Sequence, residues 1–386
     1  MIYARDLAPP NSSFFLFGPR GTGKSTWLRY QYKNAYTIDL LPPDQVLKYQ
    51  KDPLLFRAEV LAQSKNNWIV VDEVQRVPQL LDEVHFLMEN YGYKKFVLTG
   101  SSAYKLKRGA SNLLAGRAVL RSLYPLNANE THFSHNIDTA MEYGMLPMAV
   151  LTESNEQRRD YLTSSVETYL NEEVKYEGLV RNIGSFARFL EIATLSAATA
   201  VNVSSIAREA EIARDTVRGY FSVFEDTLLG SWLPAYRPRA KMKEVSKPKF
   251  YWFDPGVLNA AAGGFDQPKG PEWQGVLFEH LVHNEIKSFL DYSKSKGSLG
   301  FWGTPSSSEI DFVWWYGRKV VAIEAKSSKR FRKEDLKGFQ SFAANHSLSS
   351  RYIVYRGEKE MKVDDTWILP AEKFFRRLHR GEILGA

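Results

Sequence analysis

Residues 13–26 read Ser13-Phe-Phe-Leu-Phe-Gly-Pro-Arg-Gly-Thr-Gly-Lys-Ser-Thr26, and this stretch decides the fold of the first part of the chain. Its apolar start has the size of a buried strand, and the residues after it suit a helix. Between them stands G-x-x-x-x-G-K-S, the phosphate-binding P-loop pattern, in the strand–loop–helix context that the pattern requires. A glycine-rich turn without a ligand is the alternative interpretation.

The residue types of this loop suit a bound nucleotide. Glycines let the backbone approach a phosphate closely, and the N–H groups at the helix start attract its negative charge. We expect Lys24 to reach the β and γ phosphates and the Ser25 hydroxyl to bind Mg²⁺. The predicted nucleotide-binding residues of the loop are Gly18, Pro19, Arg20, Gly21, Thr22, Gly23, Lys24, Ser25 and Thr26.

Two further strand ends carry polar residues. The run Trp68–Val71 leads into Asp72, predicted to hold Mg²⁺, and Glu73, predicted to orient or deprotonate the attacking water. A third strand, Lys95–Thr99, is followed by Ser101, predicted to contact the nucleotide. A turn with helix-capping serines is the alternative there.

Arg117 is a candidate for sensing the nucleotide, or for stabilising transition-state charge in the active site of a neighbouring copy. A surface ion pair is the alternative. If Arg117 acts in trans, the protein is a homo-oligomer. Strands expected near residues 14, 36, 69, 97 and 119 alternate with helices, which predicts a parallel sheet covered on both faces.

The middle of the chain is expected to be helical. Residues 131–182 read as helices, and residues 184–229 read as three short helices with a tight second turn, the helix-turn-helix plan. Strands at 231–236 and 250–253 then flank a basic stretch, as the two strands of a wing would. DNA phosphates are the predicted partners of Arg214, Arg218, Arg237, Arg239, Lys241 and Lys243. An ATPase lid or a protein contact, with a solvated basic loop, is the alternative.

The last third carries a second set of candidate catalytic residues. A helix at 273–286 bears Glu279, and strands at 299–302, 309–315 and 320–326 precede a helix at about 334–345 and a strand at 351–355. Because side chains alternate along a strand, Glu324 and Lys326 share one face, and antiparallel pairing can bring Asp311 beside them.

These residue types suit a metal-dependent reaction at a phosphodiester. The carboxylates of Asp311 and Glu324 form a hard-oxygen site for Mg²⁺ or Mn²⁺, and Glu279 could complete the metal shell. The metal would activate a water molecule, while Lys326 positions the nucleophile or stabilises charge. The alternative is a same-face ion pair between Glu324 and Lys326 on a structural sheet.

The chain resembles the prokaryotic AAA+ superfamily ATPases, through Gly18–Ser25, Ile69–Glu73, Leu98–Ser102 and Leu114–Arg117. It is most similar to the branch in which the ATPase is followed by a winged helix and a restriction-endonuclease-like (PD-(D/E)XK) domain. The segments that carry this second similarity are Phe253–Val257, Phe278–Glu279, Glu309–Asp311 and Glu324–Lys326.

The resemblance implies Mg-ATP hydrolysis, with Lys24, Ser25, Asp72 and Glu73 as the matching residues. It also implies metal-dependent DNA cleavage, with Glu279, Asp311, Glu324 and Lys326 as the matching residues. One departure is that Ile310, not proline, precedes Asp311. A nucleotide-switched regulatory ATPase, whose nuclease-like domain binds without cleaving, remains the alternative function, and a plain ATPase without a nucleic-acid role is a third.

Composition bounds these expectations. The 386 residues, 44% of them hydrophobic, predict two or three folded domains, and the net charge of +7 is compatible with a polyanionic partner. The absence of cysteine excludes disulfides and thiolate metal sites. No apolar run is long enough for a membrane helix and no signal peptide is evident, so a cytoplasmic protein is expected.

The predicted fold class is α/β, with a helical and winged-helix region between two α/β domains. We expect an AAA+ P-loop ATPase core at 1–130, a helical lid with a winged helix at 131–265, and a PD-(D/E)XK nuclease-like domain at 266–386. The expected cofactors are ATP and Mg²⁺, with Mn²⁺ possible at the nuclease-like site, and the expected macromolecular partner is duplex or branched DNA.

Overall fold

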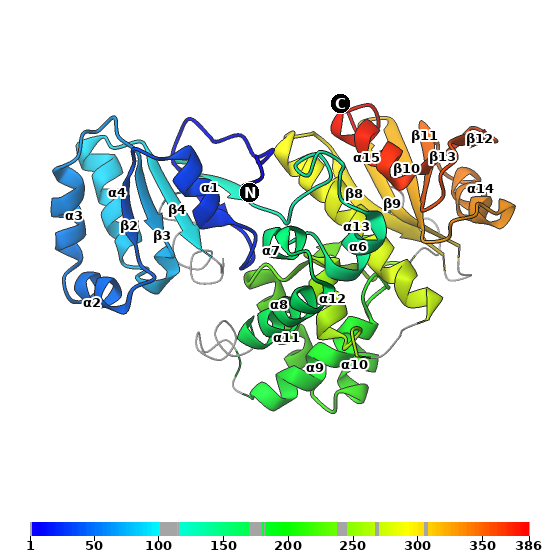
Figure 1. The fold of residues 1–386 in the computed structure, drawn as a ribbon, viewed down its shortest axis with the longest axis horizontal. Helices are drawn as coiled ribbons and strands as arrows, with labels where there is room; N and C mark the ends of the chain where they lie inside the picture. Colours follow the sequence, from blue (N-terminus) through cyan, green and yellow to red (C-terminus); the bar gives the residue numbers. More distant parts are fainter. Residues whose placement is uncertain are drawn as a thin grey trace. The chain divides into compact units, whose positions relative to one another are not determined.

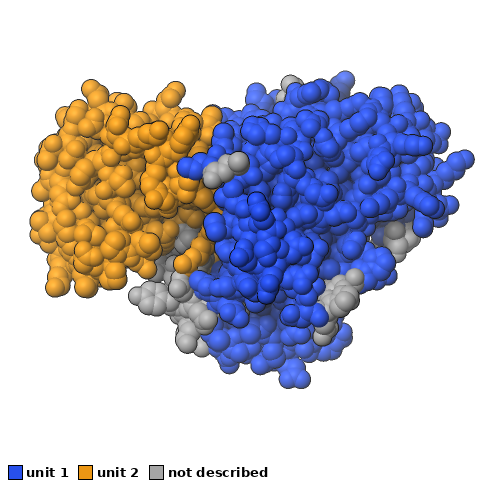
Figure 2. Space-filling model, viewed as in Figure 1, with its two compact units in different colours: residues 1–6, 125–224, 230–386 blue, residues 7–124, 225–229 orange. Residues whose placement is uncertain are grey.

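The computed structural model describes residues 2–100, 114, 116–169, 180, 182–237, 245–266, 270–304 and 308–385. The chain forms two compact units (Figure 2). Unit 2 comprises Leu7–Tyr124 and Glu225–Leu229, and unit 1 comprises Met1–Asp6, Pro125–Phe224 and Gly230–Ala386. Unit 1 therefore holds both the helical middle of the chain and its C-terminal sheet.

Unit 2 is built on a five-stranded parallel sheet with the strand order β2-β3-β4-β1-β5 (Figure 1). The strands are β1 (Phe14–Phe17), β2 (Tyr36–Asp39), β3 (Ile69–Asp72), β4 (Phe96–Gly100) and β5 (Val119–Ser122). The helices are α1 (Lys24–Gln31), α2 (Pro43–Lys51), α3 (Pro53–Leu61) and α4 (Leu80–Tyr91), with a short 3-10 turn, η1 (Val74–Arg76). The expected strand positions and the parallel sheet are confirmed.

Helices cover both faces of this sheet. Alternate residues of the buried strand β1 show this, because they pack against different helices. Phe15 and Phe17 belong to the core shared with Tyr49 of α2 and Phe56 of α3. Phe14 points to the other face, where its ring lies 6.3 Å from that of Trp27 on α1. A strand of four consecutive apolar residues is what such two-sided burial requires.

The middle of the chain is helical, as expected. It contains α6 (Ile137–Tyr143), α7 (Pro147–Leu151), α8 (Asn155–Thr168), α9 (Ile183–Leu195), α10 (Val203–Glu209), α11 (Arg214–Asp226) and α12 (Pro255–Ala261). Two antiparallel strands, β6 (Gly230–Leu233) and β7 (Lys249–Trp252), join it. Aromatic side chains of α9, α11 and β7 form its core, with Phe189 and Phe224 fully buried.

The C-terminal part is a mixed six-stranded sheet with the order β12-β13-β11-β10-β9-β8. Its elements are α13 (Pro271–Tyr292), β8 (Ser298–Gly303), β9 (Glu309–Tyr316), β10 (Lys319–Lys326), η3 (Lys333–Leu336), α14 (Lys337–Ala343), β11 (Ser350–Tyr355), β12 (Met361–Val363), β13 (Thr366–Pro370) and α15 (Ala371–His379). The expected helix, three strands, helix and strand are confirmed. Strands β12 and β13 and the last helix were not anticipated.

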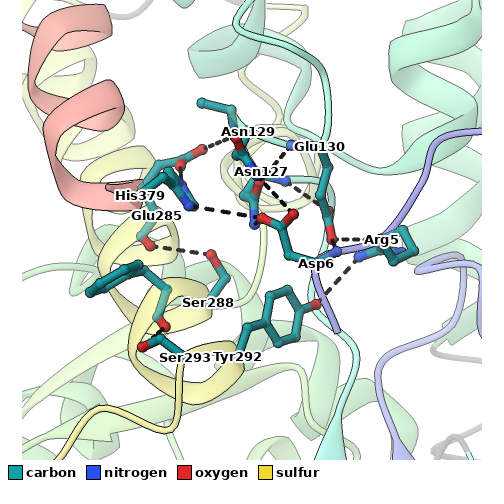
Figure 3. A network of polar contacts seen from close by, with 12 residues as sticks. Arg5, Asp6, Asn127, Asn129, Glu130, Glu285, Ser288, Tyr292, Ser293 and His379 are labelled. Atoms are coloured by element: carbon teal, nitrogen blue, oxygen red, sulfur yellow. Dashed lines mark hydrogen bonds and ion pairs between the residues drawn. The ribbon is translucent and has the colours of Figure 1, made fainter. Parts of the chain in front are cut away.

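A network of polar contacts ties residues 5–6 and 127–130 to α13 and α15 (Figure 3). Arg5 Nε lies 3.0 Å from Glu130 Oε1, and both side chains are almost fully buried. Glu285 of α13 accepts a hydrogen bond from the Ala128 N–H (2.8 Å) and contacts His379 Nε2 at 2.9 Å. Charge pairing of this kind joins segments that lie far apart in the sequence. A local sequence pattern does not predict such contacts.

Asp254 anchors the start of α12. Its Oδ1 accepts hydrogen bonds from the N–H groups of Gly256 (2.9 Å) and Val257 (3.0 Å), and its Oδ2 accepts one from Met145 (2.7 Å). Gly144 (φ 71°) makes this approach possible, since a Cβ there would lie 1.9 Å from Asp254 Oδ1.

Among the described residues, no helix combines the length and apolarity needed to cross a bilayer.

We predict that Asp254→Ala lowers the free energy of unfolding by about 2–3 kcal/mol, because three buried N–H groups lose their acceptor. Urea unfolding of the full chain measures this. Asp160→Ala, which removes an exposed carboxylate on α8, is the matched control and should change stability by less than about 0.5 kcal/mol. Equal effects of the two substitutions would contradict the anchoring role.

The His379 contact predicts a pH dependence of stability. Burial lowers the pKa of His379, but the carboxylates of Glu285, Asp6 and Glu130 outweigh it, so the pKa is raised in the folded state. The ion pair therefore stabilises the fold fully below the unfolded pKa of about 6.5 and is lost as pH rises through the folded value.

The substitution His379→Gln should accordingly lower the free energy of unfolding by about 1.5–3 kcal/mol at acid pH and by less in alkaline solution. Urea unfolding at pH 5.5 and pH 9 measures the difference between the wild type and the variant. His85→Gln in unit 2 is the control, and its effect on the free energy of unfolding should not show the pH dependence expected of His379→Gln. A difference that stays constant with pH would show that His379 acts without its charge.

Candidate functional site

The predicted phosphate-binding loop, Gly18–Ser25, joins β1 to α1 in unit 2. Gly23 precedes the helix in the left-handed conformation (φ 91°), which favours glycine. A Cβ on Gly18 would lie 2.5 Å from the carbonyl oxygen of Leu123, so a side chain there would displace backbone. Gly18 therefore permits close packing against Leu123, and Gly23 permits the backbone conformation at the start of α1.

The side chain of Lys24 folds back toward the first residues of the loop. Its Nζ donates hydrogen bonds to the carbonyl oxygens of Gly18 (2.6 Å) and Pro19 (3.1 Å), and the residue is buried. Thr22 Oγ1 also donates to the Pro19 carbonyl (2.9 Å). The ammonium group is thus held inside the loop, where a bound phosphate would compete for the same donor.

Ser25 and Asp72 are brought together although they lie 47 residues apart. The Ser25 hydroxyl donates a hydrogen bond of 2.9 Å to Asp72 Oδ2 at the end of β3. The Thr99 hydroxyl, at the end of β4, donates to Asp72 Oδ1. A serine hydroxyl beside a carboxylate fits the hard-oxygen preference of Mg²⁺. Sequence reasoning missed Thr99, whose position at a strand end was the available signal.

Glu73 is positioned by its neighbours. It adopts a left-handed backbone conformation (φ 61°), which is uncommon for a residue with a side chain. Its N–H donates to Thr99 Oγ1 (3.2 Å), and the buried Gln75 donates from Nε2 to Glu73 Oε2 (2.5 Å). An orientation this constrained is common for residues at functional sites.

The remaining nucleotide-site candidate within the described residues, Arg117, forms a surface ion pair. Its Nε lies 2.5 Å from Glu89 Oε1 on α4, and this arginine lowers the pKa of Glu89. This contact corresponds to the surface ion pair that is the alternative prediction for Arg117. A role of Arg117 in the active site of a neighbouring copy stays a prediction. Ser101 lies outside the described residues.

The structure describes three of the six residues that are predicted to contact DNA. Arg214 and Arg218 lie exposed on α11, where Arg218 also pairs with Asp215 at 2.7 Å. Arg237 is exposed after β6. Arg239, Lys241 and Lys243 lie outside the described residues.

In the C-terminal sheet, Asp311, Glu324 and Lys326 come together on the paired strands β9 and β10, whose register sets Phe312 opposite Ile323. Asp311 Oδ2 accepts a hydrogen bond from the Ala325 N–H (2.8 Å), and Glu324 Oε2 accepts one from the Asp311 N–H (3.3 Å). Lys326 Nζ lies 2.5 Å from Glu324 Oε1. The antiparallel pairing expected from the sequence is confirmed.

Lys249 of β7 enters the same group of side chains. Its Nζ lies 3.1 Å from Glu279 Oε1 and 3.9 Å from Asp311 Oδ1, and it also forms an ion pair with Glu309. The sequence predicts that the basic stretch before β7 is a wing that contacts DNA or solvent. Lys249 is instead completely buried, with its ammonium group among carboxylates of α13 and β9.

The four acidic residues, Glu279, Glu309, Asp311 and Glu324, are called the carboxylate cluster below. Burial and the neighbouring Asp311 raise the pKa of Glu324 to about 8, against the opposing effect of Lys326. Burial and Asp311 likewise raise the pKa of Glu279 to about 7, against Lys249 and Tyr251. Four carboxylates face two ammonium groups, so the fully ionised cluster lacks two positive charges.

This deficit arises only when the carboxyl groups with raised pKa lose their protons, and one divalent cation would then balance it. Asp311 and Glu324 supply oxygen ligands of the type that Mg²⁺ and Mn²⁺ prefer. Across the described part of the chain, no three His, Asp or Glu side chains are grouped so that they could hold a metal ion. The expected third ligand, Glu279, instead accepts hydrogen bonds at Oε1 from Lys249 (3.1 Å) and from the Tyr251 hydroxyl.

Comparison with protein families divides the chain into three consecutive matches. Residues 10–132 match an AAA domain, residues 134–268 match a domain of unknown function (DUF8612), and residues 274–374 match another domain of unknown function (DUF4143). The N-terminal part is therefore a P-loop ATPase domain of the AAA type. A search of curated proteins finds no match to this chain.

Three of the solved structures that match this chain do so at low identity and low TM-score. The Walker-type ATPase PABY2304 of Pyrococcus abyssi is 13% identical, with 64% of this chain and 90% of that chain covered and a TM-score of 0.41. The signal-transduction ATPase PH0952 of Pyrococcus horikoshii, which has a tetratricopeptide repeat sensor, is 12% identical (73% and 45% covered, TM-score 0.22). The DNA clamp loader delta protein YqeN of Bacillus subtilis is 13% identical (70% and 94% covered, TM-score 0.25).

The loop geometry predicts the effect of removing its lysine. Lys24→Ala should weaken ATP binding about tenfold to a hundredfold, because one charged hydrogen-bond donor to the phosphates is lost. Equilibrium titration with a fluorescent ATP analogue measures the affinity. Lys33→Ala, which removes an exposed lysine just after α1, is the matched control. Unchanged affinity in Lys24→Ala would show that the nucleotide does not bind in this loop.

Proposed function

We propose that this AAA-domain ATPase hydrolyses Mg-ATP and uses its C-terminal sheet to cleave DNA with a divalent metal ion. The observation that carries the proposal is the convergence of Asp311, Glu324 and Lys326 on neighbouring strands, with hydrogen bonds that fix both carboxylates. In this proposal the C-terminal part is a restriction-endonuclease-like domain and α9, α10, α11, β6 and β7 form a winged helix.

In the ATPase domain, the proposed roles follow from the contacts. Lys24 transfers its hydrogen bonds from the loop carbonyls to the β and γ phosphates. Ser25 and Asp72, already 2.9 Å apart, hold Mg²⁺, which neutralises phosphate charge when it is bound. Glu73, fixed through Gln75, orients the attacking water and accepts its proton.

In the nuclease-like domain, Asp311 and Glu324 hold the divalent cation. When bound, that cation lowers the pKa of a water molecule and polarises the scissile phosphate. Lys326, one-third exposed, is placed to stabilise charge on a phosphate oxygen, while Glu324 Oε1 holds its ammonium group at 2.5 Å. The partly exposed Lys326 is the member of this group through which a substrate would make contact.

DNA would be held mainly through its phosphates. Arg214 and Arg218 on α11 and Arg237 after β6 are exposed, and Arg239, Lys241 and Lys243 continue the same basic stretch in the sequence. Such contacts make affinity fall steeply with salt and give little sequence preference. A homo-oligomer in which Arg117 reaches a neighbouring ATPase site, after leaving Glu89, belongs to the same proposal.

A second candidate is a nucleotide-switched regulatory ATPase whose C-terminal domain binds a partner without cleaving it. The burial of Lys249 within the carboxylate cluster favours it, because the ammonium group already neutralises carboxylates that a metal would otherwise bind. The two candidates differ in one outcome, the cleavage of a phosphodiester.

Nicking of supercoiled plasmid with Mn²⁺ or Mg²⁺ tests the proposal. Glu324→Gln and Lys326→Met should each reduce the nicking rate about 100-fold, because the first weakens the metal site and the second removes stabilisation of developing charge. Glu358→Gln, an exposed glutamate of the same unit, is the control and should nick at the wild-type rate.

The same preparations discriminate the alternatives. Salt-dependent DNA binding without nicking in either metal supports the regulatory ATPase. If the protein hydrolyses ATP but shows no salt-dependent binding to DNA, the DNA role is refuted in both candidates.

A further inference from the structure

Strand β7 serves two different environments, because successive side chains of a strand point to opposite faces. Phe250 and Trp252 face the helical middle, where the Phe250 ring lies 5.1 Å from Phe221 and the Trp252 ring 5.3 Å from Phe224. Lys249 and Tyr251 face the other way and both hydrogen-bond to Glu279 Oε1. One strand therefore links the aromatic core of the middle region to the carboxylate cluster.

The placement of Lys249 is unusual for a lysine. The side chain is 1% exposed, and its ammonium group lies over the ring of the fully buried Phe301, 5.2 Å from the centroid. Burial of an ammonium group costs several kcal/mol unless opposite charges compensate it. Here the compensation comes from Glu279 on α13 and from Glu309 and Asp311 on β9.

The cluster is graded from its buried end to its exposed end. Asp311 and Glu324 are about nine-tenths buried, whereas the Glu309 side chain is 44% exposed. Lys249 holds Glu279 and Glu309, and Lys326 holds Glu324. Asp311 Oδ1 is 3.9 Å from Lys249 Nζ, beyond hydrogen-bond distance, so Asp311 is the least compensated carboxylate of the cluster. Glu324 lies beside it, with Oε2 on the Asp311 N–H.

We infer that Lys249 is the resident cation of this site: it supplies the positive charge that a second metal ion would otherwise bring, so that the cluster takes one divalent cation, at Asp311 and Glu324. Glu279 is then a positioning residue for Lys249 rather than a metal ligand. The inference rests on the proposed function, because it assumes that the carboxylate cluster binds a metal. It makes β7, from the middle region, a component of the C-terminal site.

The test counts metal ions. Free Mn²⁺ is measured by electron paramagnetic resonance during titration of the full chain without nucleotide, and the ions that Asp311→Asn removes are assigned to the cluster. We expect one such ion in the wild type. Lys249→Met should raise the number to two, since three carboxylates lose their shared ammonium group. Lys247→Met, an exposed neighbour, is the control and should leave one ion.

Thermal unfolding in EDTA and in Mn²⁺ gives an independent measurement. Lys249→Met should lower the midpoint in EDTA and recover much of it in Mn²⁺, because metal charge replaces the lost ammonium group. The double variant Lys249→Met/Glu279→Gln removes a charge of each sign, so it should recover stability in EDTA and bind one ion. This variant keeps the test decisive if Lys249→Met alone fails to fold without metal.

Two ions in the wild-type cluster would overturn the inference. So would a Lys249→Met variant that binds one ion, loses the same stability in EDTA and in Mn²⁺, and is not repaired by Glu279→Gln. Failure of the proposed function is separable: a wild type that binds one ion but does not nick DNA loses the nuclease role and keeps the role of Lys249. Binding of no ion at the cluster would refute both.

Discussion

The burial of a positive charge constrains how several elements of unit 1 pack together. Lys249 cannot lie in a fully buried position without carboxylates around it, and these come from α13 and β9. Its strand is fixed on the opposite face by Phe250 and Trp252. Strand β7 thereby links α13 and β9 to the aromatic core, through Lys249 on one face and Phe250 and Trp252 on the other.

The nucleotide site of unit 2 depends on strand order instead of buried charge. Strand β4 lies between β3 and β1 in the sheet, and all three are parallel. Their carboxyl ends therefore meet at one edge, where β1 leads into the P-loop, β3 ends at Asp72 and β4 contributes Thr99. Ligands of open α/β sheets bind at this edge, so the topology itself collects the polar residues.

The two sites differ in what holds their side chains before any ligand binds. In the ATPase domain, Lys24 and Ser25 are satisfied by backbone carbonyls and by Asp72, contacts that phosphate and Mg²⁺ can replace. In the C-terminal sheet, Asp311 and Glu324 are fixed by backbone N–H groups, which a ligand does not displace. In the proposed function, the first site would therefore rearrange around its nucleotide, whereas the second would need less rearrangement.

Local patterns in the sequence determined the P-loop, the five strands of the parallel sheet and the approach of Asp311 to Glu324 and Lys326. Each depends on residues close together in the sequence, or on the regular alternation of a hairpin. Only the tertiary structure decided that Lys249 lies within the carboxylate cluster, and that His379 contacts Glu285. The physical reason is that burial and charge pairing act between distant segments, whereas a sequence pattern records only what its neighbours require.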